Sequence, residues 1–163
     1  MTTIPRFRGW NFEDSMTISE WSQNNGSVIH LPPGHKKIAS EHVTEITTKM
    51  EMEFGLQDDY SQFHVYLAAY DSKVVAIATV KDSVNAIKND EKKTVRLGVQ
   101  RLFVRPSFRR KGIATAMLKT IAIMHLKGEL LSPKSDFAFS SPTEQGKTLI
   151  SSVIGQDSYF VFN

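Results

Sequence analysis

Apolar residues recur along this chain at strand spacing and at helix spacing, in segments that turn residues separate. Runs typical of strands fall at residues 16–21, 27–31, 63–69, 74–84, 99–104, 137–139 and 159–162. Apolar stripes typical of helices fall at residues 37–54, 112–122 and 142–153. The order ββαβββαβαβ predicts an α/β fold, with helices on the faces of a mixed sheet, and a single domain over residues 1–163.

Turn and stop signals mark the ends of these elements. Hairpin turns are predicted at Asn24-Asn25-Gly26 and at residues 70–73, and helix ends at Gly55 and Gly155. Residues 85–93 are charged and almost without apolar side chains, so a loop is predicted there. The strands on either side of that loop are expected to make a meander.

The most informative segment joins the strand at residues 99–104 to the helix that opens at Gly112. The first turn of a helix has amide groups without intrahelical partners and carries the positive end of the helix dipole, so it attracts phosphate. Arg109, Arg110 and Lys111 add positive charge there, and Gly112 lets a ligand approach the backbone closely. A solvated basic turn is the alternative for the three charged residues. Their position between strand and helix favours a pyrophosphate site.

Two familiar nucleotide motifs do not fit this chain. A Rossmann fingerprint needs three glycines at the junction, where only Gly112 stands. The tripeptide Gly146-Lys147-Thr148 copies the end of a P-loop, but Ser141 occupies the position of the first glycine. That tripeptide also falls inside a predicted helix. We therefore do not expect nucleotide hydrolysis.

Composition narrows the chemistry further. The chain has no cysteine, which excludes disulfides, a thiolate nucleophile and a cysteine-ligated zinc site. Its five histidines are scattered without metal-ligand spacing, so no metal site is predicted. A net charge of +3 suits an anionic ligand such as a CoA phosphate but is too weak to indicate DNA binding. No apolar run is long enough for a membrane span or a signal peptide, so a soluble, intracellular protein without a membrane partner is expected.

The junction and the C-terminus together resemble a known family. Residues Arg109-Arg110-Lys111-Gly112-Ile113-Ala114 are similar to the Arg/Gln-x-x-Gly-x-Ala/Gly motif with which GNAT N-acetyltransferases bind acetyl-CoA. The segment from Phe139 to Lys147, with the closing Phe160-Val161-Phe162-Asn163, resembles the C-terminus of the ESCO/Eco cohesin acetyltransferases. The likeness extends back through Gly98 to Val104, and more weakly as far as Gly9-Trp10.

This resemblance implies a GNAT-like fold with a mixed, mostly antiparallel central sheet flanked by helices. It implies acetyl-CoA as donor, a lysine on the SMC subunit of cohesin as acceptor, and a function in sister-chromatid cohesion in the nucleus, on chromatin. Cohesin-associated and replication factors are the further partners that it implies. The family's acetyl-CoA contacts and the basic turn fall on Leu102, Phe103, Val104, Arg109, Arg110, Lys111, Gly112, Ile113, Ala114, Thr115, Thr143, Glu144 and Gln145. The family's zinc finger is absent from this sequence.

The resemblance leaves the general base open. Vertebrate members have Ser where this chain has Gln100 and Asp where it has Ser141, at positions tied to catalysis there. A lysine amine has a reference pKa near 10.4, so neutralising it at pH 7 costs about 4.6 kcal/mol. Gln100, Ser141 and Glu144 are the candidate catalytic residues, the first two as groups that orient the amine or a water. Glu144 is either the base or the capping-box partner of Ser141, and Asp136 is a further carboxylate nearby in sequence.

Two other functions share these features. A GNAT enzyme acting on small-molecule amines would need the same acetyl-CoA motif, and only the segment from Phe139 to Lys147 argues against it. A catalytically weak module that binds acetyl-CoA or docks on cohesin is favoured by the missing aspartate at Ser141. The identity of the acceptor separates these three hypotheses.

Overall fold

The computed structural model describes residues 16–18, 26–31, 33, 41–55, 62–70, 73–109, 112–126, 129–140, 144–155 and 158–162. Its main elements are β1 (Met16–Ile18), β2 (Gly26–Leu31), α1 (Glu41–Phe54), β3 (His64–Tyr70), β4 (Lys73–Lys88), β5 (Glu91–Val104), α2 (Ile113–Met124), α3 (Pro133–Asp136), β6 (Phe137–Ser140), α4 (Glu144–Ile154) and β7 (Phe160–Phe162). The predicted order of strands and helices is confirmed. The additions are the short helix α3 and a 3-10 turn at Pro106–Phe108, where the sequence indicates only a break.

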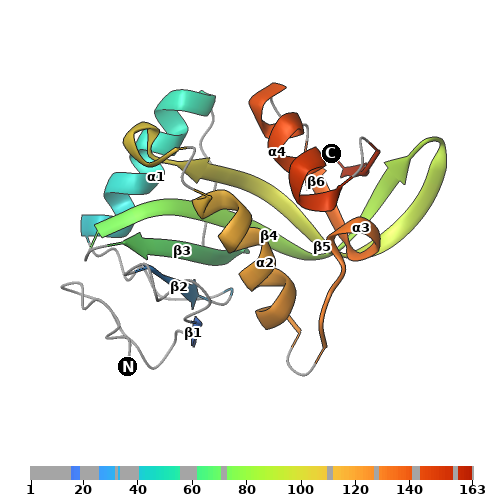
Figure 1. Cartoon of the computed structure of the whole chain (residues 1–163), viewed down its shortest axis with the longest axis horizontal. Helices are drawn as coiled ribbons and strands as arrows, with labels where there is room; N and C mark the ends of the chain where they lie inside the picture. Colours follow the sequence, from blue (N-terminus) through green and yellow to red (C-terminus); the bar gives the residue numbers. More distant parts are fainter. Residues whose placement is uncertain are drawn as a thin grey trace.

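The strands form one sheet in the order β1-β2-β3-β4-β5-β6-β7 (Figure 1). Strands β1 to β5 are antiparallel to one another in succession, whereas β6 runs parallel to both β5 and β7. A further antiparallel bridge joins Ile87 of β4 to Val161 of β7. The predicted α/β class, with a mixed and mostly antiparallel sheet, is therefore confirmed.

The two faces of the sheet carry separate hydrophobic cores. Side chains alternate along a strand, so neighbours in sequence join different cores. On β3, Tyr66 belongs to the core that includes Met117 of α2, while Leu67 belongs to the core that includes Met50 of α1. Figure 1 shows α1 and α2 on opposite sides of the sheet. The face toward α2 also holds a cluster of polar side chains around Tyr66, which is described below.

Residues 85–93, predicted as a loop, form the outer part of a long hairpin instead. Strands β4 and β5 pair from Ala76 with Val104 out to Lys88 with Glu91, and the hairpin extends well away from the helices in Figure 1. A small core of buried side chains holds its base, formed by Val84, Ala86, Val95, Ala138, Phe160 and Phe162. The loop prediction was wrong because most of the apolar side chains in this core come from outside residues 85–93, and half of them come from two other strands, β6 and β7.

Asn24 and Asn25 of the first predicted turn, and Asp71 and Ser72 of the second, lie outside the described residues. The hairpin predicted at residues 70–73 is confirmed, because Tyr70 of β3 pairs antiparallel with Lys73 of β4. The helix ends at Gly55 and Gly155 are confirmed, with φ of 68° and 79°. Among the helices that the structure describes, none has the length and apolar character needed to cross a membrane.

Candidate functional site

A break in the sheet lies at the middle of β5. The parallel ladder between β5 and β6 runs from Leu97 with Phe137 to Val99 with Phe139, and β5 continues to Val104 paired with β4. The β4–β5 register shifts at the same point, because Thr79 pairs with Arg101 and Val80 with Val99. Gln100 is therefore the extra residue of a β-bulge, a feature common next to active sites. Strands β5 and β6 therefore stop pairing just before Leu102, the first residue predicted to contact acetyl-CoA.

Two buried polar atoms without partners lie beside this bulge. Among the described residues, Gln100 Oε1 and Thr79 Oγ1 have no hydrogen-bond partner, although a buried polar group left unpaired costs about 1–3 kcal/mol. Such groups are retained where a ligand or a water supplies the missing bond. The predicted site residue Gln100 thus lies at the break in the sheet. Thr79 was not predicted, because only its register opposite Arg101 brings it there.

The helix that follows β5 begins as the sequence predicts. Gly112 is the N-cap of α2, with φ of 80° and ψ of 8°, and its carbonyl accepts the amide of Ala116 at 2.9 Å. This left-handed conformation strongly favours glycine. Gly112 is exposed, Ile113 is buried, and Ala114 and Thr115 are half-buried. The backbone amides of residues 113–115 lie in the first helical turn, where no carbonyl of the helix can accept them.

Arg109 has partners of its own at this junction. Its Nε donates to the carbonyl of Val104 at 2.8 Å, and one terminal nitrogen binds Glu53 of α1 at 2.7 Å. Its guanidinium also lies 5.5 Å from the centre of the Phe103 ring. Arg109 therefore links α1 to the end of β5, a structural role in addition to the predicted one of binding pyrophosphate. The other basic residues of the turn, Arg110 and Lys111, lie outside the described residues.

The remaining predicted site residues fall on β5 and at the start of α4. Phe103 is buried toward α1, whereas Leu102 and Val104 pack against the core toward α2. Glu144 and Gln145 open α4, and their side chains lie outside the described part of the structure, as do Ser141 and Thr143. The capping box and the catalytic roles of Ser141 and Glu144 stay predictions. Asp136 ends α3, where its carboxylate accepts the Ser132 amide at 2.7 Å.

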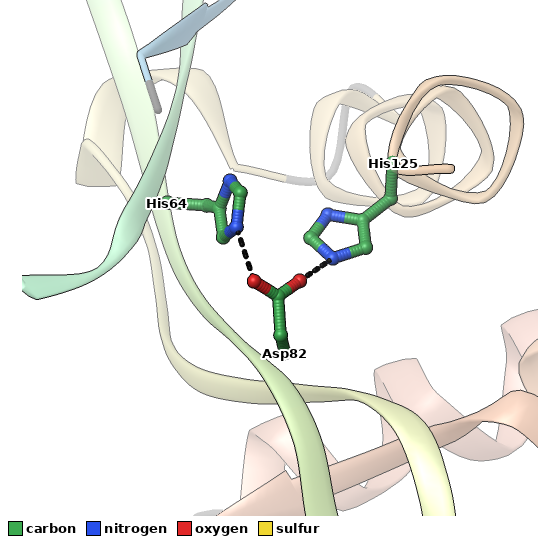
Figure 2. Close-up of side chains that lie close together, drawn as sticks. All are labelled: His64, Asp82 and His125. Carbon is green, nitrogen blue, oxygen red and sulfur yellow. Dashed lines mark hydrogen bonds and ion pairs between the residues drawn. The ribbon is translucent and has the colours of Figure 1, made fainter. Parts of the chain in front are cut away.

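A second cluster of polar side chains, which the sequence does not predict, lies on the face of the sheet toward α2. Both rings in Figure 2 point at the carboxylate of Asp82: His64 Nε2 lies 2.8 Å from Oδ2, and His125 Nε2 lies 2.6 Å from Oδ1. His64 Nδ1 lies 2.9 Å from Nε2 of His30, and His125 Nδ1 lies 3.0 Å from the hydroxyl of Tyr66. We call these five residues the histidine cluster.

Three strands and one helix end contribute to the histidine cluster. His30 of β2 pairs with Tyr66 of β3, and His64 lies two residues before Tyr66 on the same face. Asp82 of β4 lies two residues beyond Val80, the register partner of His64. His125 directly follows α2. The sequence alone indicates that His64 and Tyr66 share a face, because they lie two residues apart on one strand. The contact of all five residues depends on how β2, β3 and β4 pair.

Burial lowers the pKa of two of the histidines. The pKa of His30 falls from 6.5 to about 4, mainly by desolvation and then by repulsion from His64 and His125. Desolvation also lowers the pKa of His125, against the hydrogen bond to Asp82. Burial favours a higher pKa for Asp82, but the hydrogen bonds from His64 and His125 outweigh it and lower the pKa. Near neutral pH the cluster therefore has neutral His30 and His125 around an ionised carboxylate.

A protein-family model matches the part of the chain that contains the bulge at Gln100 and the start of α2. Residues 93–162 match the family model described as ESCO1/2 acetyl-transferase. N-acetyltransferase eco of Drosophila melanogaster is 23% identical over 98% of this chain, and N-acetyltransferase ESCO1 of Homo sapiens is 26% identical over 97%. The chain spans 16% and 22% of the lengths of those two relatives.

Solved structures share the fold. The xEco2 acetyltransferase domain superposes with a TM-score of 0.79 at 23% identity, covering 91% of this chain and 96% of that one. The same domain bound to a lysine–CoA conjugate gives a TM-score of 0.76 at 24% identity, covering 85% and 93%. An aminoglycoside acetyltransferase reaches only 0.53 at 15% identity, covering 81% and 89%. In its family-model match and its relatives the chain is similar to the ESCO/Eco acetyltransferases, as the sequence indicates, and it shares the fold of one solved acetyltransferase domain of that group.

Proposed function

We propose that this chain is an acetyl-CoA-dependent protein-lysine N-acetyltransferase whose acceptor is the SMC subunit of cohesin. The observation that carries the proposal is the bulge at Gln100, where the β5–β6 ladder ends and beyond which β5 leads to the glycine-capped start of α2. This arrangement lies within the segment that matches the family model. The similarity to ESCO/Eco proteins is the support for cohesin as partner and for a place on chromatin in the nucleus. It also supports cohesin-associated and replication factors as further partners.

The residues at the break in the sheet fit acetyl-CoA. Acetyl-CoA supplies an acetyl thioester that an amine can attack directly. The first-turn amides of α2, at Ile113, Ala114 and Thr115, are suited to hold the pyrophosphate, and Gly112 leaves the approach to them open. The strand edge from Leu102 to Val104 offers backbone groups to the pantetheine arm. In the relative with a solved lysine–CoA conjugate, the same fold holds both CoA and a lysine.

The acceptor amine needs a group that orients it and one that takes its proton. Gln100 is the best-placed orienting group, because its buried Oε1 has no partner among the described residues and can accept a hydrogen bond from an amine or a water. Thr79 Oγ1 can serve a water at the same bulge. Glu144, the first residue of α4, and Ser141, which precedes it in sequence, are the other proposed groups. The base stays unassigned between Glu144 and a water held by these residues.

Transfer of labelled acetyl groups tests the proposal. The tag-free protein is incubated with labelled acetyl-CoA and, separately, a cohesin SMC head, a panel of polyamines, or no acceptor. We expect label on a lysine of the SMC head alone. Label only on polyamines would mean a small-molecule acetyltransferase, and acetyl-CoA binding without transfer would mean a docking module.

Substitution of Gln100 tests the acceptor side of the site. Gln100→Ala removes the unpaired amide oxygen, and we expect kcat to fall about tenfold or more while acetyl-CoA affinity stays unchanged. Glu91→Gln, at an exposed position on the hairpin, serves as control and should keep full activity. Full transfer rates in Gln100→Ala would remove Gln100 from the site.

A further inference from the structure

We propose that His64, Asp82 and His125 bind a divalent first-row transition metal, with Zn²⁺ the best match, at the C-terminal end of α2. Two imidazoles and one carboxylate are a donor set typical of zinc sites with three protein ligands, in which water fills the fourth position. This site would be separate from the one that binds acetyl-CoA. The two lie at opposite ends of α2, a helix of 12 residues that is about 18 Å long.

The donor atoms already lie close to the arrangement that a metal needs. One ligand atom from each of the three residues lies within 4.8 Å of the others, and the two imidazole nitrogens approach the carboxylate at 2.8 Å and 2.6 Å. Tetrahedral ligands at zinc distances stand about 3.3 Å apart. The two nitrogen–oxygen pairs would therefore open by about 0.5–0.7 Å, and a pair at the 4.8 Å limit would close by about 1.5 Å, to hold the ion.

Exposure of the three ligands leaves an entry path. The side chain of His125 is fully buried and that of His64 is 14% exposed, whereas 60% of the Asp82 side chain is exposed. A cation can therefore reach the carboxylate from solvent and exchange water on that side. The two histidines, fixed by β3 and by the end of α2, supply the buried half of the site (Figure 2).

The outer members of the histidine cluster allow both imidazoles to become ligands without net proton loss. An ionised Asp82 can only accept hydrogen bonds, so without metal the Nε2 atoms of His64 and His125 carry protons and donate to it. The Nδ1 atom of His64 then accepts from His30, and the Nδ1 atom of His125 accepts from Tyr66. When metal replaces the Nε2 protons, each ring carries its proton on Nδ1 and donates it outward, to Nε2 of His30 or to the hydroxyl oxygen of Tyr66. The proton that His30 gives up from Nε2 reappears on its own Nδ1. On the other side of the cluster, the His125 ring and the Tyr66 hydroxyl likewise keep one proton each.

His30 supports the proposed ligand His64 from the side away from Asp82. This side chain is only 7% exposed, and its Nδ1 has no hydrogen-bond partner among the described residues. A fully matched polar network would not leave such an atom. As the outer partner of His64 Nδ1, His30 holds that ring in place, which is how metal-bound histidines are commonly oriented.

Metal binding to the tag-free protein, stripped with EDTA, tests the site. We expect Zn²⁺ to bind at one site per chain by calorimetry and to raise the Tm by about 5–10 °C at a hundredfold excess over Kd. Co²⁺ should give the visible absorption of a tetrahedral complex. Asp82→Asn keeps the size of the side chain and loses its charge, so we expect at least a tenfold weaker affinity for Zn²⁺ and no tetrahedral Co²⁺ spectrum.

A matched control separates the site from nonspecific binding. Asp90→Asn makes the same change at the exposed hairpin turn, and it should bind Zn²⁺ as the unchanged chain does. His64→Gln is the second site variant, which should also lose the spectrum and which covers the case that Asp82→Asn does not fold. Equal Zn²⁺ affinity in the unchanged chain and in folded site variants would overturn the proposal, as would an octahedral Co²⁺ spectrum. In that case the cluster is a hydrogen-bonded network only.

Discussion

Gly112 and Gly155 have nearly the same backbone conformation, with φ of 80° and 79°, and an added Cβ would meet no atom within 4 Å at either position. Substitution by alanine at either position should therefore lower the free energy of unfolding by a similar amount, about 1 kcal/mol. Only Gly112 faces the proposed pyrophosphate site. We expect Gly112→Ala to weaken acetyl-CoA binding about tenfold, measured by calorimetry, and Gly155→Ala to leave it unchanged. Equal affinities would place the ligand elsewhere.

The pH dependence of stability should reflect the buried histidines. The pKa of His30 is lowered to about 4 and that of His125 is also lowered, so below pH 6.5 the unfolded chain takes up protons that the folded chain does not. With EDTA present, the free energy of unfolding should fall by about 2 kcal/mol from His30 alone between pH 7 and pH 5, and His125 should add to this loss. The lowered pKa of Asp82 adds to this loss only at more acidic pH. Denaturant titrations across this range measure the effect, and a flat profile would contradict it.

Among the elements, the β4–β5 hairpin departs most from what the sequence predicts. Its turn residues Asn89 and Asp90 have φ of 49° and 66°, as in a type I′ turn, where glycine at the second position is favoured. Asp90→Gly should therefore stabilise the chain by about 0.5 kcal/mol, and Asp90→Val should destabilise it by about 1 kcal/mol. Thermal melts of both variants check this. Opposite signs would mean that the hairpin is not formed as described.

The elements could be predicted where the signal is local and not where it depends on partners. The start of α2 at Gly112 and the end of α4 at Gly155 follow from glycine and helical periodicity, and both are confirmed. The hairpin was missed because its few buried residues, such as Val95, form a core only together with residues of β6 and β7, which are distant in sequence. The meeting of His64 with Asp82 depends on strand register, which a single sequence does not fix. Side-chain roles at Ser141 and Glu144 are still predictions.

At the scale of the whole molecule, close packing joins β4, β5 and β7 at the base of the hairpin. A Cβ at Gly98 of β5 would lie 2.8 Å from Val84 of β4 and 2.9 Å from the Phe162 ring of β7. Gly98→Ala should therefore destabilise the chain by about 1–3 kcal/mol, measured by denaturant unfolding, with loss of acetyl-CoA binding only as the chain unfolds. Gly55→Ala, with open space around it, is the control for the loss of a glycine alone. A Gly98→Ala chain as stable as the original would mean that the hairpin base is loosely packed.

Ligand binding should protect one continuous part of the chain from hydrogen exchange. Acetyl-CoA at a hundredfold excess over Kd stabilises the folded chain by about 2.7 kcal/mol, which raises the Tm by about 5–10 °C for a domain of this size. Exchange should slow in β5 beyond Val99 and in the first turn of α2, while the tip of the hairpin around Asn89 exchanges as before. Acetyl-pantetheine, which lacks the pyrophosphate, should protect β5 and leave the first-turn amides of α2 unchanged. If acetyl-pantetheine protected α2 as strongly as acetyl-CoA does, the helix N-terminus would not be the pyrophosphate site.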